Sequence, residues 1–203
     1  VSSTWGENMI VRYNGITGKY MDIFVPNGTG GMIYPRGLVF GPDGNLYVND
    51  RTNGNVLRFN GVTGQFIDEF VTVRSGGLAG PTGLVFGPDG NLYVSNWGKD
   101  NILRYNGVTG EFMDIFASGG GLKRPYGLIF GPNNDLFVCS EYSDSILRYS
   151  GSTGAFLGEF VKANSGGLSH PSYMIFTPEP SMLLLLGAGG LFLRRAGKVW
   201  SQR

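Results

Sequence analysis

The stretch "GPDGNLYVND" at residues 41–50 returns as "GPDGNLYVSN" at residues 87–96, with its first eight residues unchanged. Other residues return at nearly the same interval. Arginine does so at Arg12, Arg58, Arg104 and Arg148, and proline does so at Pro35, Pro81, Pro125 and Pro171. Self-similarity at a fixed period of this length indicates a repeat architecture, in which each repeat is one small unit of secondary structure. One repeat therefore decides the fold.

Residues 37–71 contain one such repeat. Its halves, "GLVFGPDGNLYV" and "NVLRFNGVTGQFIDEF", each consist of two β-forming runs around a turn. Proline presets φ in these turns, and asparagine and glycine tolerate positive φ. The first hairpin is apolar at consecutive positions, which suits strands that are covered on both faces. Four antiparallel strands per repeat, packed between neighbouring sheets, predict an all-β fold of the β-propeller type.

The repeats account for most of the chain. Three are complete, at residues 37–71, 83–116 and 127–161. Residues 9–25 supply the third and fourth strands of another repeat, and residues 1–3 match the end of its second strand. "YMIF" at residues 173–176 reads as a first strand with no successor. We therefore expect about four four-stranded blades over residues 1–177. They form either a ring closed by joining the two ends, or a fragment of a larger propeller truncated before Val1.

Composition narrows the possible partners. The 203 residues include 16 basic and 15 acidic side chains, so no electrostatic footprint for a phosphate backbone exists and we expect no nucleic-acid partner. Cys139 is the single cysteine, which excludes an internal disulfide. It falls where Asn49 and Ser95 fall in the other repeats, so we expect a small buried residue. No residue pattern indicates a cofactor.

The repeat "RPYGLIFGPNNDLFVCSEYSDSILRYSGSTG" at residues 124–154 carries a family resemblance. It and its siblings resemble the NHL-type propeller repeats of bacterial secreted proteins. More loosely, they resemble the regucalcin, gluconolactonase and streptogramin-lyase propellers. The likeness covers about residues 1–177 and implies the propeller scaffold. It implies no single activity, because this fold hosts unrelated functions.

The last residues, 178–203, form a separate segment. Pro178, Glu179 and Pro180 precede an apolar run over residues 182–193, and Arg194 and Arg195 follow it. This order resembles a PEP-CTERM sorting segment. The resemblance implies export after a signal peptide, sorting to the cell envelope or extracellular matrix, and cleavage of the tail by a dedicated sorting transpeptidase.

The apolar run itself predicts a short helix. It would rise only about 18 Å, short of the roughly 30 Å of a bilayer core. We expect contact with the inner membrane only through this tail, and only until the sorting transpeptidase removes it. A buried C-terminal helix packed on the propeller is the alternative.

The most repeated polar residues have a structural interpretation. The turns carry Asp43, Asp89, Asn133, Asn14, Asn60 and Asn106, and such side chains hydrogen-bond nearby backbone amides. The repeated arginine stands on the third strand of each blade. The fourth strand carries Asp22, Asp68 and Asp114 in three repeats and Gly158 in the last. This spacing predicts a cross-strand ion pair in three blades.

Residues that differ between repeats are the better candidates for function, because maintenance of the fold does not dictate them. They precede the first strand or follow the second, and propeller geometry puts them on one face. Arginine, tryptophan and tyrosine there form a plausible binding surface, and tryptophan and tyrosine also stack on sugar rings. Ordinary loop packing is the alternative. The candidate ligand-binding residues are Arg36, Asp50, Arg51, Thr82, Asn96, Trp97, Tyr126, Glu141 and Tyr142.

Two functional hypotheses follow. The first is an exported, non-enzymatic propeller that binds an extracellular glycan or protein, with no catalytic residue and no metal. The second is a metal-dependent hydrolase or lyase of the gluconolactonase or streptogramin-lyase type. A metal site would have to draw on Asp50, Asn96 and Glu141, and a lyase would need a histidine base. His170 is the only histidine and reads as a loop residue.

Overall fold

The computed structural model describes residues 6–177, which form one two-stranded and three four-stranded antiparallel sheets. We call the sheets blades 1 to 4. Blade 1 contains β1 (Ile10–Tyr13) and β2 (Tyr20–Val25). Blade 2 contains β3 (Pro35–Phe40), β4 (Leu46–Asp50), β5 (Asn55–Phe59) and β6 (Phe66–Val71). Blade 3 contains β7 (Pro81–Phe86), β8 (Leu92–Asn96), β9 (Asn101–Tyr105) and β10 (Phe112–Ser118). Blade 4 contains β11 (Pro125–Phe130), β12 (Leu136–Ser140), β13 (Ser145–Tyr149) and β14 (Phe156–Val161).

Short 3-10 turns occupy several of the connections between strands. They are η1 (Thr29–Gly31), η2 (Ser75–Gly77), η3 (Trp97–Lys99), η4 (Glu141–Ser143) and η5 (Ser165–Gly167).

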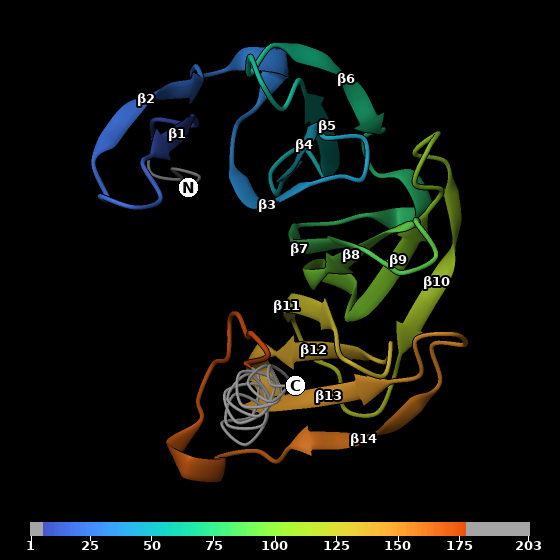
Figure 1. Ribbon diagram of the computed structural model, residues 1–203. Helices are drawn as coiled ribbons and strands as arrows, with labels where there is room; N and C mark the ends of the chain where they lie inside the picture. Colours follow the sequence, from blue (N-terminus) through green and yellow to red (C-terminus); the bar gives the residue numbers. More distant parts are fainter. Residues whose placement is uncertain (1–5, 178–203) are drawn as a thin grey trace, which may run out of the picture.

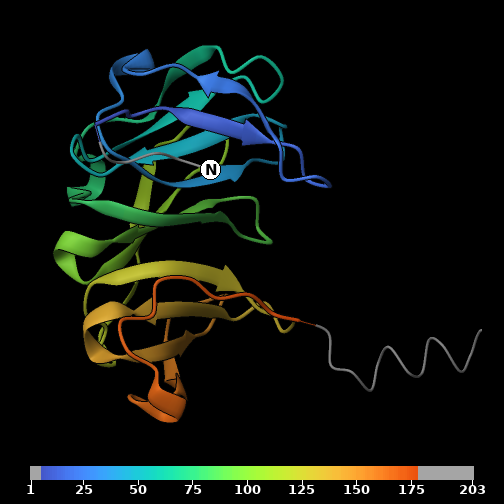
Figure 2. The ribbon, with the colours of Figure 1, turned by 90° about the vertical axis from the view of Figure 1, so that its left-hand side faces the viewer.

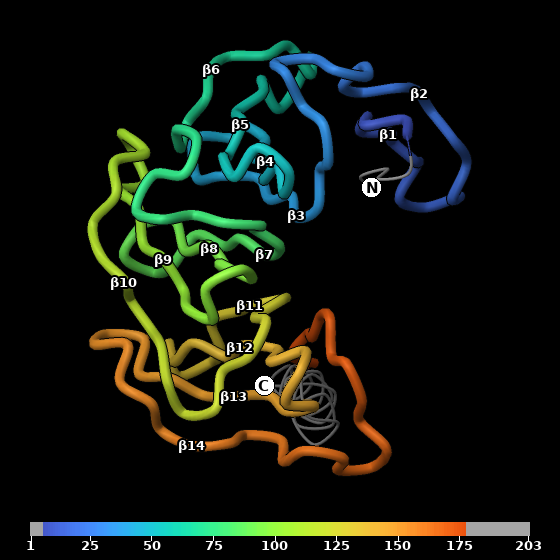
Figure 3. The backbone as a smooth tube through the Cα atoms, turned by 180° about the vertical axis from the view of Figure 1, so that it is seen from behind, coloured from blue at the N-terminus to red at the C-terminus, as the bar shows by residue number. Residues whose placement is uncertain are grey.

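The blades stand side by side in an arc, with β3, β7 and β11 on the concave inner wall and β6, β10 and β14 outside (Figure 1). A view turned by 90° shows them stacked one upon the next (Figure 2). From behind, blades 1 and 4 stand at opposite ends of the arc (Figure 3). The all-β propeller prediction is confirmed. Over residues 6–177 the arc is open, so the described blades do not form a ring closed by the chain's own two ends.

Residues 173–176, which we expected to form a first strand, are not a strand in the structure. The segment nevertheless lies beside β11. The Gly127 amide donates to the Ser172 carbonyl at 2.7 Å, and the Phe176 and Phe137 rings pack with centroids 5.0 Å apart. A strand needs ladder partners. Within residues 6–177 no second strand pairs with this segment, and the strand prediction therefore fails.

The core lies between blades rather than within one. β4, β8 and β12 are buried along their whole length, which explains why the sequence is apolar at consecutive positions there. One cluster joins Tyr47 and Phe70 of blade 2 to Leu84 and Val94 of blade 3. Stability of each blade therefore depends on its neighbours.

Close contacts tie the inner strands together. A Cβ on Gly37 would lie 2.5 Å from the Thr82 carbonyl oxygen of the next blade. Asn49 bridges the same two blades, because its Oδ1 accepts from the Gly37 amide at 2.8 Å and its Nδ2 donates to the Thr82 carbonyl at 2.9 Å. The Thr82 hydroxyl then donates to the Pro125 carbonyl at 2.8 Å. Blades 2, 3 and 4 are thus linked along the inner wall.

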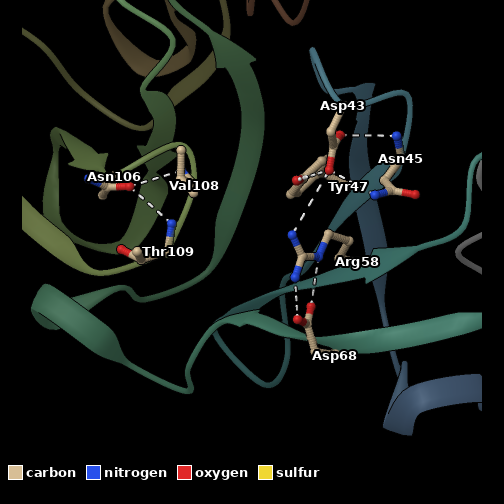
Figure 4. A network of polar contacts seen from close by, with 8 residues as sticks. All are labelled: Asp43, Asn45, Tyr47, Arg58, Asp68, Asn106, Val108 and Thr109. Atoms are coloured by element: carbon tan, nitrogen blue, oxygen red, sulfur yellow. Dashed lines mark hydrogen bonds and ion pairs between the residues drawn. The ribbon is translucent and has the colours of Figure 1, made fainter.

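Five of the six turn residues, Asn14, Asp43, Asn60, Asp89 and Asn106, accept hydrogen bonds from nearby backbone amides as predicted, and Figure 4 shows Asp43 and Asn106. The Asp43 carboxylate accepts from the Asn45 amide at 3.0 Å. Asn106 accepts from the Val108 and Thr109 amides at 2.9 and 3.0 Å. These contacts satisfy backbone amides inside the turns, which gives the repeated residues a structural role.

The predicted ion pairs form in blades 1, 2 and 3. In blade 2 the Arg58 guanidinium donates to both carboxylate oxygens of Asp68 (Figure 4). The same two-bond geometry joins Arg12 to Asp22 and Arg104 to Asp114.

In blade 4 the repeated arginine has a different acidic partner. Arg148 faces Gly158 across the strands and instead donates to Asp135, with its Nε at 2.8 Å and Nη2 at 2.5 Å. The hydrogen bond from Arg148 lowers the pKa of Asp135 below its ordinary value. In blade 4 the carboxylate thus comes from the residue before the second strand, whereas in the other blades it comes from the fourth strand. The repeated arginine has an acidic partner in every blade.

Cys139 is completely buried, as expected, and burial raises the pKa of its thiol to about 12. The expectations for residues 1–3 and for the tail at residues 178–203 lie outside the described residues. Within residues 6–177, no helix has the length and apolar character needed to cross a bilayer.

Candidate functional site

Strand pairing brings the candidate residues to one end of the blades. In the first two strands of blades 2, 3 and 4, the proline that opens the inner strand faces the last residue of the second strand. The inner-strand candidates Arg36, Thr82 and Tyr126 therefore begin next to the loops that carry the other candidates. We call this end the loop face, and it comprises residues 26–36, 50–54, 72–82, 96–100, 119–126, 140–144 and 162–172.

Asp50 is a loop anchor. Its carboxylate is fully buried and accepts from the Ile33 and Tyr34 amides at 2.7 and 3.1 Å. The Thr52 amide donates to it at 3.0 Å and the Asn53 side chain at 2.9 Å. The carboxylate thereby joins the loop before β3 to the loop after β4.

The equivalent residues of blades 3 and 4 anchor the corresponding loops without a charge. Asn96 is buried and accepts from the Ala79 amide at 2.7 Å, while its Nδ2 donates to Asn101 at 2.9 Å. In blade 4 the Ser140 hydroxyl accepts from the Lys123 amide at 2.9 Å. Because position and partners recur, Asp50 and Asn96 serve loop geometry.

Trp97 lies at the centre of a contact between three blades. The Arg51 guanidinium lies 4.2 Å from the centroid of its indole ring, and the Arg124 guanidinium lies 4.0 Å from it. The indole Nε1 donates to Glu141 at 2.8 Å, and the Tyr142 ring meets the indole edge-on with centroids 6.2 Å apart. We call Arg51, Trp97, Arg124, Glu141 and Tyr142 the Trp97 cluster.

The cluster carries unneutralised positive charge. Arg51 and Arg124 are half-buried, and within residues 6–177 neither guanidinium forms an ion pair with a carboxylate. A guanidinium over an aromatic face is held in place by the quadrupole of the ring but keeps its hydrogen-bond donors available. One of the Arg124 donors forms a hydrogen bond to the Trp97 carbonyl at 3.1 Å. The remaining donors can meet an anionic group.

His170 extends the cluster along the loop face. Its ring meets the exposed Tyr142 ring with centroids 5.8 Å apart. Its Nδ1 lies 2.9 Å from the Ser169 hydroxyl and 3.7 Å from the Asp144 carboxylate. The exposed imidazole thus lies beside the Asp144 carboxylate, and both residues belong to loops.

Arg124 was not among the candidates, although the sequence contains a usable signal. It directly precedes a repeated proline, at a position that is Tyr34, Gly80 and His170 in the other blades. The Arg124 backbone is left-handed, with φ of 51°, and the Asp100 carboxylate accepts from its amide at 2.8 Å. Because Arg124 varies between blades and has a left-handed backbone, it is as strong a candidate for ligand binding as the residues named from the sequence.

Of the inner-strand candidates, Arg36 lines a cavity of about 460 Å³ on the concave wall, together with Gly83, Gly127 and Tyr173 among others, and Thr82 and Tyr126 are not part of its lining. The Arg36 guanidinium lies 4.9 Å from the Tyr34 ring centroid and 5.8 Å from that of Tyr126. Thr82 is buried, and its hydroxyl is used by the Pro125 carbonyl. The cavity is therefore lined mainly by backbone and apolar atoms, with one cation at its edge.

Within residues 6–177, histidine, cysteine, aspartate and glutamate do not gather in any group of three that could hold a metal ion. Asp50 and Asn96 are engaged by loop backbone, and Glu141 accepts from Trp97. The structure does not bring these three residues together as a ligand set.

Comparisons with known proteins bear on the fold. No family model matches the sequence, and no curated protein matches it. Among solved structures, an inactive variant of virginiamycin B lyase from Staphylococcus aureus, in complex with quinupristin, is 19% identical with a TM-score of 0.62. The match covers 82% of this chain and 52% of the lyase.

Two further structures are similar. A chain of a nidogen/laminin complex is 16% identical with a TM-score of 0.61, over 82% of this chain and 59% of that one. The WD40 repeats of RRP9 are 13% identical with a TM-score of 0.59, over 77% and 48%. The chain spans about half the length of these proteins. At such low identity the likeness establishes the propeller fold alone.

Proposed function

We propose that this protein is exported and non-enzymatic, and that it binds a carboxylate-bearing protein partner through the Trp97 cluster. The observation that carries the proposal is the pair of guanidinium groups of Arg51 and Arg124, fixed over one indole and without ion pairs in the described chain. Arginine donates two parallel hydrogen bonds to a carboxylate, which gives both affinity and orientation.

A protein partner fits this cluster better than a neutral sugar. The indole face that would stack on a sugar ring is covered by guanidinium groups, and its Nε1 is already used by Glu141. Tyr142 is 57% exposed and stands beside the cluster. Arginine and tyrosine together are typical of the residues that dominate protein interfaces. An acidic glycan is the alternative ligand.

A hydrolase or lyase is the second hypothesis. It draws on His170, whose exposed imidazole lies 3.7 Å from the Asp144 carboxylate, because histidine is a common general base. If the purified protein opens a lactone or eliminates a cyclic ester, and His170→Ala removes that turnover, this hypothesis replaces the first.

Export and sorting complete the proposal. They rest on the order Pro178, Glu179, Pro180, apolar run, Arg194 and Arg195, which resembles a sorting segment. A sorting transpeptidase would act on this tail and leave the propeller in the envelope or outside the cell. Mass spectrometry of the mature protein tests this part, because a mass that still includes residues 182–203 would contradict cleavage.

Binding is tested with the double variant Arg51→Gln/Arg124→Gln, which removes both charges but leaves a polar side chain that can still form hydrogen bonds. Lys19→Gln, a charge removal at the opposite end of the blades, is the control. The probe is an extracellular matrix fraction, presented untreated, protease-treated or periodate-treated. We expect the double variant to bind at least tenfold more weakly, since a charge-assisted hydrogen bond contributes about 1.5–3 kcal/mol.

Three outcomes would contradict the proposal. Equal binding by the double variant and the wild type would show that the cluster is not the site. Equal losses in the double variant and in Lys19→Gln would indicate non-specific attraction. Binding that survives protease but not periodate would assign the site to a glycan instead.

A further inference from the structure

The junction between neighbouring blades is built from the same contacts each time. In the first contact, a left-handed glycine in the loop after the outer strand lies under an aromatic ring of the next blade. A Cβ on Gly30, Gly76 or Gly120 would overlap the ring of Phe66, Phe112 or Phe156, respectively. A residue with a side chain cannot occupy this position once the next blade is in place.

The second contact runs in the other direction. The hairpin turn of the following blade places a left-handed glycine over a carbonyl oxygen of the preceding outer strand. A Cβ on Gly64, Gly110 or Gly154 would overlap the carbonyl oxygen of Phe24, Phe70 or Phe116, respectively. These three phenylalanines are only 5–6% exposed.

A third contact is a hydrogen bond from the third strand to the same loop. The Tyr105 hydroxyl donates to the Ser75 carbonyl, and the Tyr149 hydroxyl donates to the Gly119 carbonyl, both at 2.9 Å. Each junction thus has a giving hairpin, with its turn glycine, and a receiving face, with its phenylalanine carbonyl and loop glycine. The tyrosine hydrogen bond is added at the junctions that blades 3 and 4 form with the preceding blade, whereas blade 2 has Phe59 at the tyrosine position.

The two ends of the arc each display one half of this junction. At blade 4 the receiving half is open, because Phe160 is 53% exposed and a Cβ on Gly166 would meet no atom of residues 6–177 within 4 Å. At blade 1 the giving half is open. A Cβ on Gly18 meets nothing within 4 Å, and Tyr13 and Tyr20 are both exposed.

We propose that the open face of blade 4 binds the β1–β2 hairpin of a second copy of this chain, in a head-to-tail contact. Gly18 of one copy would lie over the Phe160 carbonyl of the other, with Tyr20 above Gly166. The Tyr13 hydroxyl would donate to the Ser165 carbonyl, as its counterparts Tyr105 and Tyr149 do to their loops.

Two observations select a second copy as the occupant. The chain itself carries a hairpin with the required glycine and tyrosines, and Figure 1 shows this hairpin at the opposite end of the arc from the open face of blade 4. The part of this chain that matches virginiamycin B lyase also makes up only 52% of that propeller. Two arcs joined head to tail can therefore complete a ring of comparable length.

The segment at residues 171–177 makes the fit more specific. It lies beside β11, on the inner side of the open face, where the first strand of a following blade belongs. β1 and β2 correspond to the third and fourth strands of a blade. The second copy would thus supply the outer half of a blade whose inner part the first copy already contributes. A head-to-tail contact either closes into a ring or continues into a chain of copies.

Substitution with asparagine tests each half separately, because asparagine tolerates a left-handed backbone but adds a Cβ. Gly166→Asn blocks the receiving face and Gly18→Asn blocks the giving hairpin. Gly167→Asn is the matched control, since this left-handed position and its counterparts in the other blades have free space around a Cβ. Gly44→Asn is a second control, because Asn134 already occupies the equivalent position of blade 4 with φ of 59°.

The measurement is the solution mass of the full chain at micromolar concentration, by light scattering and sedimentation. We expect the wild type and both controls to reach at least twice the 21.9 kDa of one chain, and each blocked variant to stay at that mass with an unchanged β-type circular dichroism spectrum. An equimolar mixture of the two blocked variants should recover a dimer, because each supplies the intact half that the other lacks.

Other results would overturn the proposal. A monomeric wild type would show that the open face does not bind a second copy. Loss of assembly in Gly166→Asn alone, with Gly18→Asn unaffected, would indicate a symmetric contact between two blade 4 faces. Assembly that survives both substitutions would place the contact elsewhere.

Discussion

Gly37→Ala is expected to loosen the contact between blades 2 and 3. Gly37 is buried at the point where β3 meets the next blade, and its φ lies outside the left-handed region, so alanine itself is compatible with the backbone. The added Cβ would lie 2.5 Å from the Thr82 carbonyl oxygen, 2.8 Å from Leu84 Cδ2 and 2.9 Å from Asn49 Nδ2. The Thr82 carbonyl oxygen is a backbone atom of β7 and cannot move away without that strand.

The cost follows from two effects. Overpacking a well-packed core costs about 1–3 kcal/mol. Separating the blades also breaks the buried hydrogen bond from Asn49 to Thr82, and an unsatisfied buried polar group costs about 1–3 kcal/mol. We therefore expect a loss of about 2–5 kcal/mol in the free energy of unfolding. For a chain of this size that lowers Tm by roughly 5–15 °C.

Thermal unfolding followed by circular dichroism measures this loss, with urea unfolding as a second measurement. Gly15→Ala is the matched control, because a Cβ there meets nothing within 4 Å and its φ is also outside the left-handed region. The control should stay within about 0.5 kcal/mol of the wild type. If Gly37→Ala unfolds at the same temperature as Gly15→Ala, the inner strands do not need the glycine and our account of the inner wall is wrong.

Three further outcomes are expected. Because burial raises the pKa of the Cys139 thiol to about 12, native protein should react with a thiol reagent at pH 8 only at its rate of unfolding, and fast native labelling would contradict the structure. Burial pushes the pKa of Asp89 up but hydrogen bonds from Asn91 and other partners bring it below its ordinary value, so its stabilising effect is present above pH 4 and lost as pH falls through the folded pKa. Urea unfolding should therefore show a smaller loss of stability below pH 4 in Asp89→Asn than in the wild type. Tyr105→Phe should cost about 1–2 kcal/mol in urea unfolding because the Ser75 carbonyl loses a buried donor, and an unchanged midpoint would refute that contact.

The cross-strand pairs illustrate what could be predicted. Arg58 and Asp68 meet because a hairpin with a short turn has one register, and that register follows from the turn residues and the alternation of the strands. The same local logic places Asn106 in its turn and Cys139 in the core. It gives no partner for Arg148, which faces Gly158 and pairs with Asp135 in the turn before β12.

The candidate site was harder to predict for a related reason. From the sequence Asp50 is a candidate for binding a ligand or a metal, with loop packing as the alternative, and only the positions of the Ile33 and Tyr34 amides show its role as a loop anchor. Trp97 reads as an open stacking surface, whereas residues far from it in the chain cover its ring.

The sequence by itself determined the period, the hairpins and the contacts inside each hairpin, because these depend on residues a few positions apart. Only the tertiary structure decided what happens between blades: the bridge at Asn49, the cations over Trp97 and the open arc. These features depend on the angle at which one sheet packs on the next, which is set by many small contacts summed over the whole interface. No single motif in the chain encodes that angle.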